Sequence, residues 1–182
     1  MNIIRNILKK IRGEQSLDRL KKRGLVIGDN VTIMGGCIID PSHCWHIRIG
    51  SDVILAPRVH IIAHDASTKL FMGFTKVANV TIGNRVFIGA GTVVLPGVTI
   101  GDDVVIGAGT VVNKDIPSGS VAAGVPVRIV SSLADYIDKE KEKKRVENSF
   151  SDDYTLRNEN FSAEQINVLR EACEKYGQIF VE

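Results

Sequence analysis

His64 is the residue whose type and position first suggest chemistry. It stands in the stretch Ile62-Ala-His64-Asp65, where a regular apolar pattern breaks off after Ile61 and resumes only at Ile82. Loops inserted into a rigid scaffold often carry function, and a histidine at the root of such a loop is held in place yet accessible. Because imidazole gains and loses a proton near neutral pH, it can serve as an acid or a base. The alternative is a polar loop histidine with structural hydrogen bonds only.

The pattern around this break repeats every six residues. Each hexad opens with an aliphatic residue, glycine often follows, and a small or branched apolar residue takes the fifth position. The clearest run opens hexads at Ile82, Ile88, Val94, Ile100, Ile106 and Val112, with fifth positions Val86, Thr92, Val98, Val104, Thr110 and Ile116. A less regular set opens at Ile27, Ile33, Ile39, Ile49, Leu55 and Ile61. Such a fixed period indicates a solenoid, and neither a helical period nor strand alternation fits it.

A triangular prism of very short strands accommodates these hexads, three to a turn. The first and fifth side chains fill the axis, and the other residues turn the corners. Glycines stand beside the inward aliphatic residue, where a side chain would crowd the bend: Gly28, Gly50, Gly83, Gly89, Gly101 and Gly107. The sequence therefore predicts an all-β solenoid, a parallel β-helix.

Changes in composition divide the chain into three parts. We expect an amphipathic helical segment at residues 1–24, the β-helix at 25–130 with an inserted loop at about 63–80, and a charged, mainly helical extension at 131–182. Ser162 with Gln165 predicts a capping box for a last helix that runs to about Tyr176. No function is assigned to this extension.

Charge and cysteine content exclude several classes of partner. The formal net charge is +2, and no basic stripe is interleaved with aromatics, so we expect no nucleic-acid binding. Cys37, Cys44 and Cys173 have neither metal-site spacing nor a disulfide framework. We therefore expect no metal, and the cysteine usage suits a reducing cytoplasm.

Residues 1–12 combine apolar residues on one helical face with surrounding arginines and lysines. The segment is too short to span a bilayer, and it lacks the pattern of a signal peptide. It either covers the open end of the first coil or lies on an anionic membrane. The second alternative would put the protein at the inner membrane surface.

The second half of the pattern resembles the hexapeptide-repeat acyltransferases, in particular the acetyltransferases of sugars, oligosaccharides and some xenobiotics. The resemblance covers roughly residues 27–130 and rests on the stretch from Val80 to Ala90, the Leu-Pro-Gly-Val-Thr-Ile-Gly run from Leu95, Asn113-Lys-Asp-Ile-Pro117, and the Ala-Gly-Val-Pro run ending at Pro126. It implies a left-handed coil. It also implies transfer of an acetyl group from acetyl-CoA to a hydroxyl of a sugar, oligosaccharide or polysaccharide precursor.

The resemblance also implies roles for single residues. His64 matches the family's histidine at the loop root and would be the general base. The backbone N–H of Ala90, where several members have serine, would bind the oxyanion. Coenzyme A would contact Ala90, Ala108, Asn113, Lys114 and Arg128, and Phe87 replaces a tryptophan often found there.

Acceptor contacts are harder to place. Asp40 falls near the family's acidic acceptor-binding position, and Asp65 is expected to contact substrate or orient the ring of its neighbour, although adjacent residues of an extended chain point to opposite sides. His43, Trp45 and His46 disturb the register between Asp40 and His64. Trp45 is either a platform for a sugar or a buried corner filler, and the second is the default expectation.

The outward sixth positions predict assembly. They are more apolar than a solvated prism face tolerates: Ile38, Ile54, Phe87, Val93, Val105 and Val111. His60 belongs to one of these columns. The resemblance implies a homotrimer with active sites between subunits.

Other functions are left open at this point. Within the same chemistry they are an N-acetyltransferase of an amino sugar, a xenobiotic acetyltransferase, or a serine acetyltransferase, whose large helical N-terminal domain does not precede the repeat here. A metal-dependent protein resembling the gamma-class carbonic anhydrases would use His60 and His64, but it needs three imidazoles. A noncatalytic scaffold is the remaining alternative.

Overall fold

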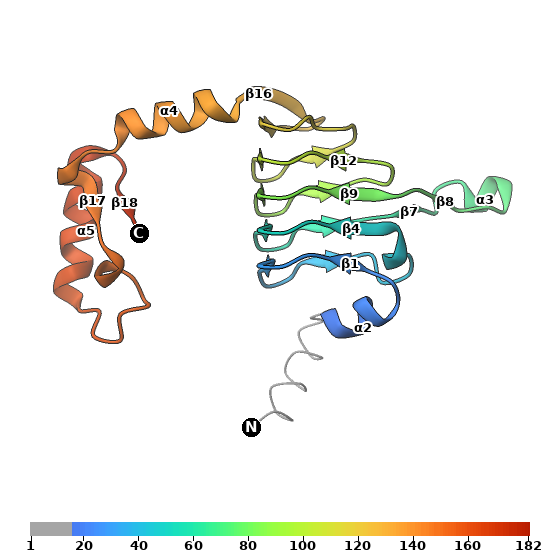
Figure 1. Cartoon of the computed structure of the whole chain (residues 1–182), viewed down its shortest axis with the longest axis horizontal. Coiled ribbons are helices and arrows are strands. Elements are labelled where there is room, and N and C mark those ends of the chain that lie inside the picture. The colour runs from blue at the N-terminus through green and yellow to red at the C-terminus, as the bar shows by residue number, and fades with distance from the viewer. Residues whose placement is uncertain (1–15) are drawn as a thin grey trace. The chain divides into compact units, whose positions relative to one another are not determined.

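Three parallel sheets form the faces of a prism, around which the chain winds from one face to the next. A computed structural model describes residues 16–182, and the expectations for residues 1–15 lie outside this range. As far as Val112, successive strands of the coil fall on faces A, B and C in turn, and strands one turn apart pair with each other. Figure 1 shows the resulting stack of coils. The predicted parallel solenoid is confirmed at this level.

The strands are two to five residues long. Face A contains β1 (Val26–Ile27), β4 (Ile47–Ile49), β9 (Val80–Ile82) and β12 (Thr99–Ile100). Face B contains β2 (Thr32–Ile33), β5 (Ile54–Leu55), β10 (Val86–Ile88), β13 (Val104–Ile106), β15 (Ser120–Ala123) and the antiparallel β16 (Arg128–Ser132). Face C contains β3 (Ile38–Ile39), β6 (His60–Ile61), β11 (Val93–Val94) and β14 (Val111–Val112).

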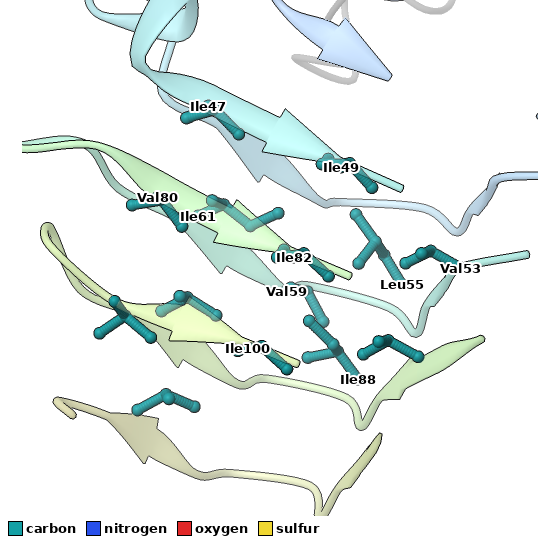
Figure 2. Close-up of a cluster of buried hydrophobic side chains, with 14 of the residues drawn as sticks. Ile47, Ile49, Val53, Leu55, Val59, Ile61, Val80, Ile82, Ile88 and Ile100 are labelled. Carbon is teal, nitrogen blue, oxygen red and sulfur yellow. The ribbon is translucent and has the colours of Figure 1, made fainter. Parts of the chain in front are cut away.

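The axis of the prism is filled by the two predicted inward columns. In register along face A, for example, Ile49 lies beside Ile82, which lies beside Ile100, and each is no more than 2% exposed. Figure 2 shows these isoleucines meeting Val53, Leu55 and Val59 from the other faces. Even the polar members Thr92 and Thr110 are buried, because both hydroxyls donate to the Gly107 carbonyl oxygen, at 3.1 and 2.7 Å. Ile27 and Ile33, in the first coil, are only partly buried.

Two additions interrupt or precede the coil. The short helix α2 (Leu17–Lys22) comes before β1, and its Leu20 is buried in the core. Between β6 and β9 a hairpin leaves the prism, formed by β7 (His64–Asp65), α3 (Lys69–Met72) and β8 (Lys76–Val77). It projects well beyond the coils in Figure 1. A short 3₁₀ turn, η1 (Cys44–His46), adds residues between β3 and β4.

The last residues, from Asp135 to Glu182, form a separate compact unit. It contains most of α4 (Leu133–Lys143), then η2 (Val146–Asn148), β17 (Ser149–Phe150), η3 (Asp152–Tyr154), α5 (Ala163–Tyr176) and β18 (Phe180–Val181). The predicted capping box is confirmed, since Ser162 and Gln165 each accept a hydrogen bond from the other's backbone N–H. No helix of the described residues has the length and apolar character needed to cross a bilayer.

Candidate active site

His64 lies at the edge where face C turns toward face A, and Asp40 lies one coil before it at the same edge. Asp40 follows β3 and His64 follows β6, and these strands are paired with Ile39 beside Ile61. The Asp40 backbone N–H continues this ladder by donating to the Ile61 carbonyl oxygen at 2.9 Å. The two side chains therefore meet, and His64 Nδ1 is hydrogen bonded to Asp40 Oδ2.

The Asp40 carboxylate is buried and held from several sides. Its residue is 3% exposed. Oδ1 accepts from the backbone N–H groups of Ser42 and His43, at 3.0 and 3.2 Å, and Oδ2 accepts from that of Ala63 at 3.0 Å. Burial acts to raise the pKa of Asp40, but the hydrogen bond from His64 and those from the backbone outweigh it, so the pKa lies below its usual value.

The charge of Asp40 fixes the proton on the histidine ring. An ionised carboxylate only accepts hydrogen bonds, so Nδ1 of His64 donates, and in the neutral ring Nε2 has the free lone pair. The His64 side chain is 32% exposed, which leaves the ring accessible to a substrate. An imidazole held by a buried carboxylate can remove a proton and is stabilised once it carries the charge.

Asp65 faces away from this pair. Its carboxylate forms an ion pair with Lys76 Nζ at 2.6 Å and accepts from the Ser67 backbone N–H at 2.8 Å. The contact with Lys76 and the bonds to Ser67 hold the pKa of Asp65 well below its usual range. The role of orienting the ring, for which the sequence offered Asp65, thus belongs to Asp40. Asp40 in turn is buried under His64 and does not present its carboxylate to an acceptor.

The remaining predicted residues divide between two edges of face C. Asn113 and Lys114 follow β14 and are exposed at the same edge as His64. Ala90 and Ala108 lie at the opposite edge, where face B turns into face C, in successive coils joined by the bond from Gly109 N–H to the Ala90 carbonyl at 2.8 Å. One chain therefore separates its histidine from Ala90 by the full width of face C.

Arg128 belongs to the edge of Ala90 and Ala108. It is paired with Ala123, whose Cβ lies next to Gly107, the residue before Ala108. Phe87 points outward from face B and is 42% exposed. Within residues 16–182, neither Lys114 nor Arg128 forms an ion pair, so both cations are available to a phosphate.

The histidines expected of a metal-dependent rival do not come together. His60 points outward from face C, between Ile38 and Val93. The group that could hold a metal among the described residues is instead Asp40, His43 and His64, with ligand atoms within 4.8 Å of one another. It offers two imidazoles, whereas that rival needs three, and the Asp40 carboxylate is already occupied by hydrogen bonds.

Sequence reasoning missed the part that His43 and Trp45 play beside the site. The His43 ring contacts that of His64 at a tilt of 36°, with centroids 4.7 Å apart, and the centroid of the Trp45 ring is 5.4 Å from that of His43. The default expectation of a buried Trp45 is wrong, since the residue is 47% exposed. The extra residues between Asp40 and Ile47, which break the hexad register, could have indicated that this segment lies beside the site.

Comparison with known proteins identifies the family of the chain. Residues 79–114 match the family model of the bacterial transferase hexapeptide (six repeats). The chain is 33% identical over 175 residues to protein CapG of Staphylococcus aureus, covering 92% of this chain and 95% of that protein.

Two solved structures share the fold. A maltose O-acetyltransferase from Clostridium difficile 630 is 29% identical, with a TM-score of 0.53, over 70% of this chain and 83% of that one. A galactoside acetyltransferase in complex with coenzyme A is 32% identical, also with a TM-score of 0.53, over 70% of this chain and 72% of that one. The parallel prism and these relatives together show that the chain belongs to the hexapeptide-repeat acetyltransferase family.

Proposed function

We propose that this protein transfers an acetyl group from acetyl-CoA to a hydroxyl of a sugar, oligosaccharide or polysaccharide precursor. The observation that carries the proposal is the pair formed by His64 and the buried Asp40. It provides a partly exposed imidazole whose Nε2 has a free lone pair in the neutral ring, which is what the deprotonation of an alcohol requires. The names of the relatives, which act on maltose and galactosides, support a sugar as the acceptor.

The reaction follows from these groups. Nε2 of His64 takes the proton of the acceptor hydroxyl while the hydroxyl oxygen attacks the carbonyl carbon of the thioester. The carbonyl oxygen becomes an oxyanion, which accepts a hydrogen bond from the Ala90 N–H. When the tetrahedral intermediate collapses, the C–S bond breaks, the thiolate takes the proton from His64, and the acetyl ester and coenzyme A leave.

A homotrimer with sites between subunits is part of the same proposal. His64 and Ala90 stand at opposite edges of face C, so a second copy is needed to bring one chain's base to another chain's oxyanion donor. Outward side chains on faces B and C support such contacts: Ile38, Ile54 and Phe87 are about 40% exposed in the single chain. Face A differs, because after Val26 its outward column continues with Arg48, Thr81 and Thr99.

The family resemblance implies a left-handed coil, and we propose this handedness for the β-helix. Ala108, Asn113, Lys114 and Arg128 would contact coenzyme A, with the two cations neutralising phosphate charge, and Phe87 would lie beside the cofactor or acceptor.

Calorimetric titration with acetyl-CoA tests the cofactor without knowledge of the acceptor. We expect saturable binding that weakens in Lys114→Ala and Arg128→Ala, and is retained in His64→Ala. With an accepted sugar, His64→Ala should lose about 10²- to 10⁴-fold in kcat. Lys139→Ala, an exposed lysine of the C-terminal unit, is the matched control and should bind as the wild type does. Absence of binding by the folded protein would reject the acetyltransferase, and near-normal turnover by His64→Ala would reject the assigned base.

A further inference from the structure

The segment Pro41–His46 is tied down at both ends and in its middle. The Arg23 guanidinium donates to the Pro41 carbonyl oxygen at 3.0 Å. Cys44 is fully buried, with its thiol near the carbonyl oxygens of Leu20 and Arg23. His46 Nδ1 and Asn79 Oδ1 are 2.8 Å apart. The segment therefore has little freedom to move.

Trp45 is exposed although the backbone that carries it is fixed. A Cβ added at Gly24 would lie 2.8 Å from Trp45 Cβ, so the base of the side chain is packed against backbone. The residue is nevertheless 47% exposed. A large apolar ring on a rigid segment loses little entropy on binding, which is the property of a preformed aromatic platform.

The platform is connected to the catalytic pair by a row of rings that contact one another at a tilt. His43 lies between His64 and Trp45, at centroid distances of 4.7 and 5.4 Å, and its backbone N–H is held by the Asp40 carboxylate. The indole is thus one ring beyond the base. A sugar whose hydroxyl reaches His64 would cover His43, and a ring linked to that sugar would reach Trp45.

We infer that Trp45 is the platform of a second acceptor subsite, on which the sugar ring next to the acetylated one stacks. The acceptor class is then a glycan of at least two sugar rings. The inference rests on the proposed function for its chemistry. Apart from its two histidines the segment itself contains no ionisable surface side chain, so neutral sugars are the first probes.

Trp45 is the single tryptophan of the chain, so its fluorescence reports on the subsite directly. We would titrate the full-length protein with maltose, lactose, glucose, galactose and, as an aromatic alcohol, chloramphenicol. We expect maltose or lactose to change the emission saturably and the monosaccharides to do so at concentrations about tenfold higher. His64→Ala should give the same titration, which separates the platform from the base.

Kinetics of the same panel supply the second readout. Trp45→Ala should raise KM for the accepted disaccharide about tenfold, with kcat and the KM for acetyl-CoA unchanged, and Trp45→Phe should restore most of the affinity. Tyr136→Ala, which removes an exposed aromatic of α4, is the matched control.

Three results would overturn the inference. One is a disaccharide that is acetylated with the same KM by the wild type and Trp45→Ala, which would leave the proposed function intact. Another is a change of emission and acetylation with chloramphenicol but with no sugar. The last is the absence of any sugar response in both readouts, which would reject the subsite, while acetyl-CoA binding would still decide the proposed function.

Discussion

The Asp40 carboxylate orients the His64 ring and supplies a counter-charge for it. For activity, the charge of Asp40 should therefore matter more than the shape of its side chain. Asp40→Asn retains one oxygen acceptor but cannot stabilise the imidazolium that forms when His64 takes a proton. We expect kcat to fall about 10²-fold or more and the free energy of unfolding to fall by about 1–3 kcal/mol, because an amide N–H₂ would face the Ala63 or Ser42 N–H. Acetylation assays and urea denaturation measure the two effects.

Asp103→Asn is the matched control for this change. Asp103 pairs with Arg85 at the surface, and its backbone φ of 58° is one that asparagine also adopts. We expect kcat to remain near that of the wild type. A similar loss of activity in both variants would mean that the charge of Asp40 has no particular role.

The same carboxylate makes stability depend on pH. The folded-state pKa of Asp40 is lowered, so its ionised form stabilises the fold above the unfolded-state pKa, about 3.9. This stabilisation is lost as the pH falls through the folded-state value. Over the range in which this carboxylate titrates, the difference in unfolding free energy between wild type and Asp40→Asn should therefore shrink as the pH falls below about 4. A difference that grows as the pH falls below about 4 would contradict the assigned direction.

At the scale of the element, the coil bends at glycines that cannot accept a side chain. A Cβ at Gly50 would lie 2.6 Å from the Gly83 carbonyl oxygen of the next coil, and that atom is backbone and cannot move aside. Gly50→Ala should therefore cost about 2 kcal/mol or more of unfolding free energy. Chemical denaturation monitored by circular dichroism measures it.

Gly35→Ala is the internal comparison for this prediction. A Cβ at Gly35 would meet nothing within 4 Å. Since alanine also reduces the freedom of the unfolded chain, the variant should be as stable as the wild type or more stable by up to about 1 kcal/mol. Equal destabilisation in both variants would show that glycine freedom, rather than the packing of coils, limits the bend.

The elements were predictable to the extent that the hexad pattern is local. Gly28, Gly50, Gly83, Gly89, Gly101 and Gly107 all proved to be sites where a Cβ would come closer than 3.0 Å to another coil, as the pattern indicated. The meeting of Asp40 with His64 was not predictable, because the extra residues after Asp40 shift the register of the chain before β4. The sequence offered Asp65 as the residue that orients His64. In the structure the Asp65 carboxylate instead forms an ion pair with Lys76 in the hairpin.

At the scale of the molecule, the outward side chains decide which faces of the prism can be buried against a second copy of the chain. Ile54 lies on face B in register with Phe87, and a charge placed there would lose its water if the face is an interface. We expect Ile54→Glu to be monomeric by light scattering, with an unchanged circular dichroism spectrum. Arg48→Glu, on face A, should remain a trimer. A trimer in both variants would move the proposed interface away from face B.

His64 is separated from Ala90, Ala108 and Arg128 within one chain. This separation predicts that two variants with little activity on their own form active sites when they are mixed. His64→Ala lacks the base at one edge of face C, and Arg128→Glu has a repulsive charge at the other edge, where it should weaken acetyl-CoA binding. If each site joins edges from two copies, trimers assembled from equal amounts of both variants contain some sites with two intact edges. Random assembly gives about a quarter of the sites this property.

Activity at low acetyl-CoA concentration measures this restoration, with each variant alone as the reference. We expect the mixed trimers to recover about a quarter of the wild-type rate. Mixed trimers whose rate does not exceed the average of the separate variants would place both edges of a site in one chain. The base and the oxyanion donor would then have to meet through a rearrangement of face C, which its buried and paired strands oppose.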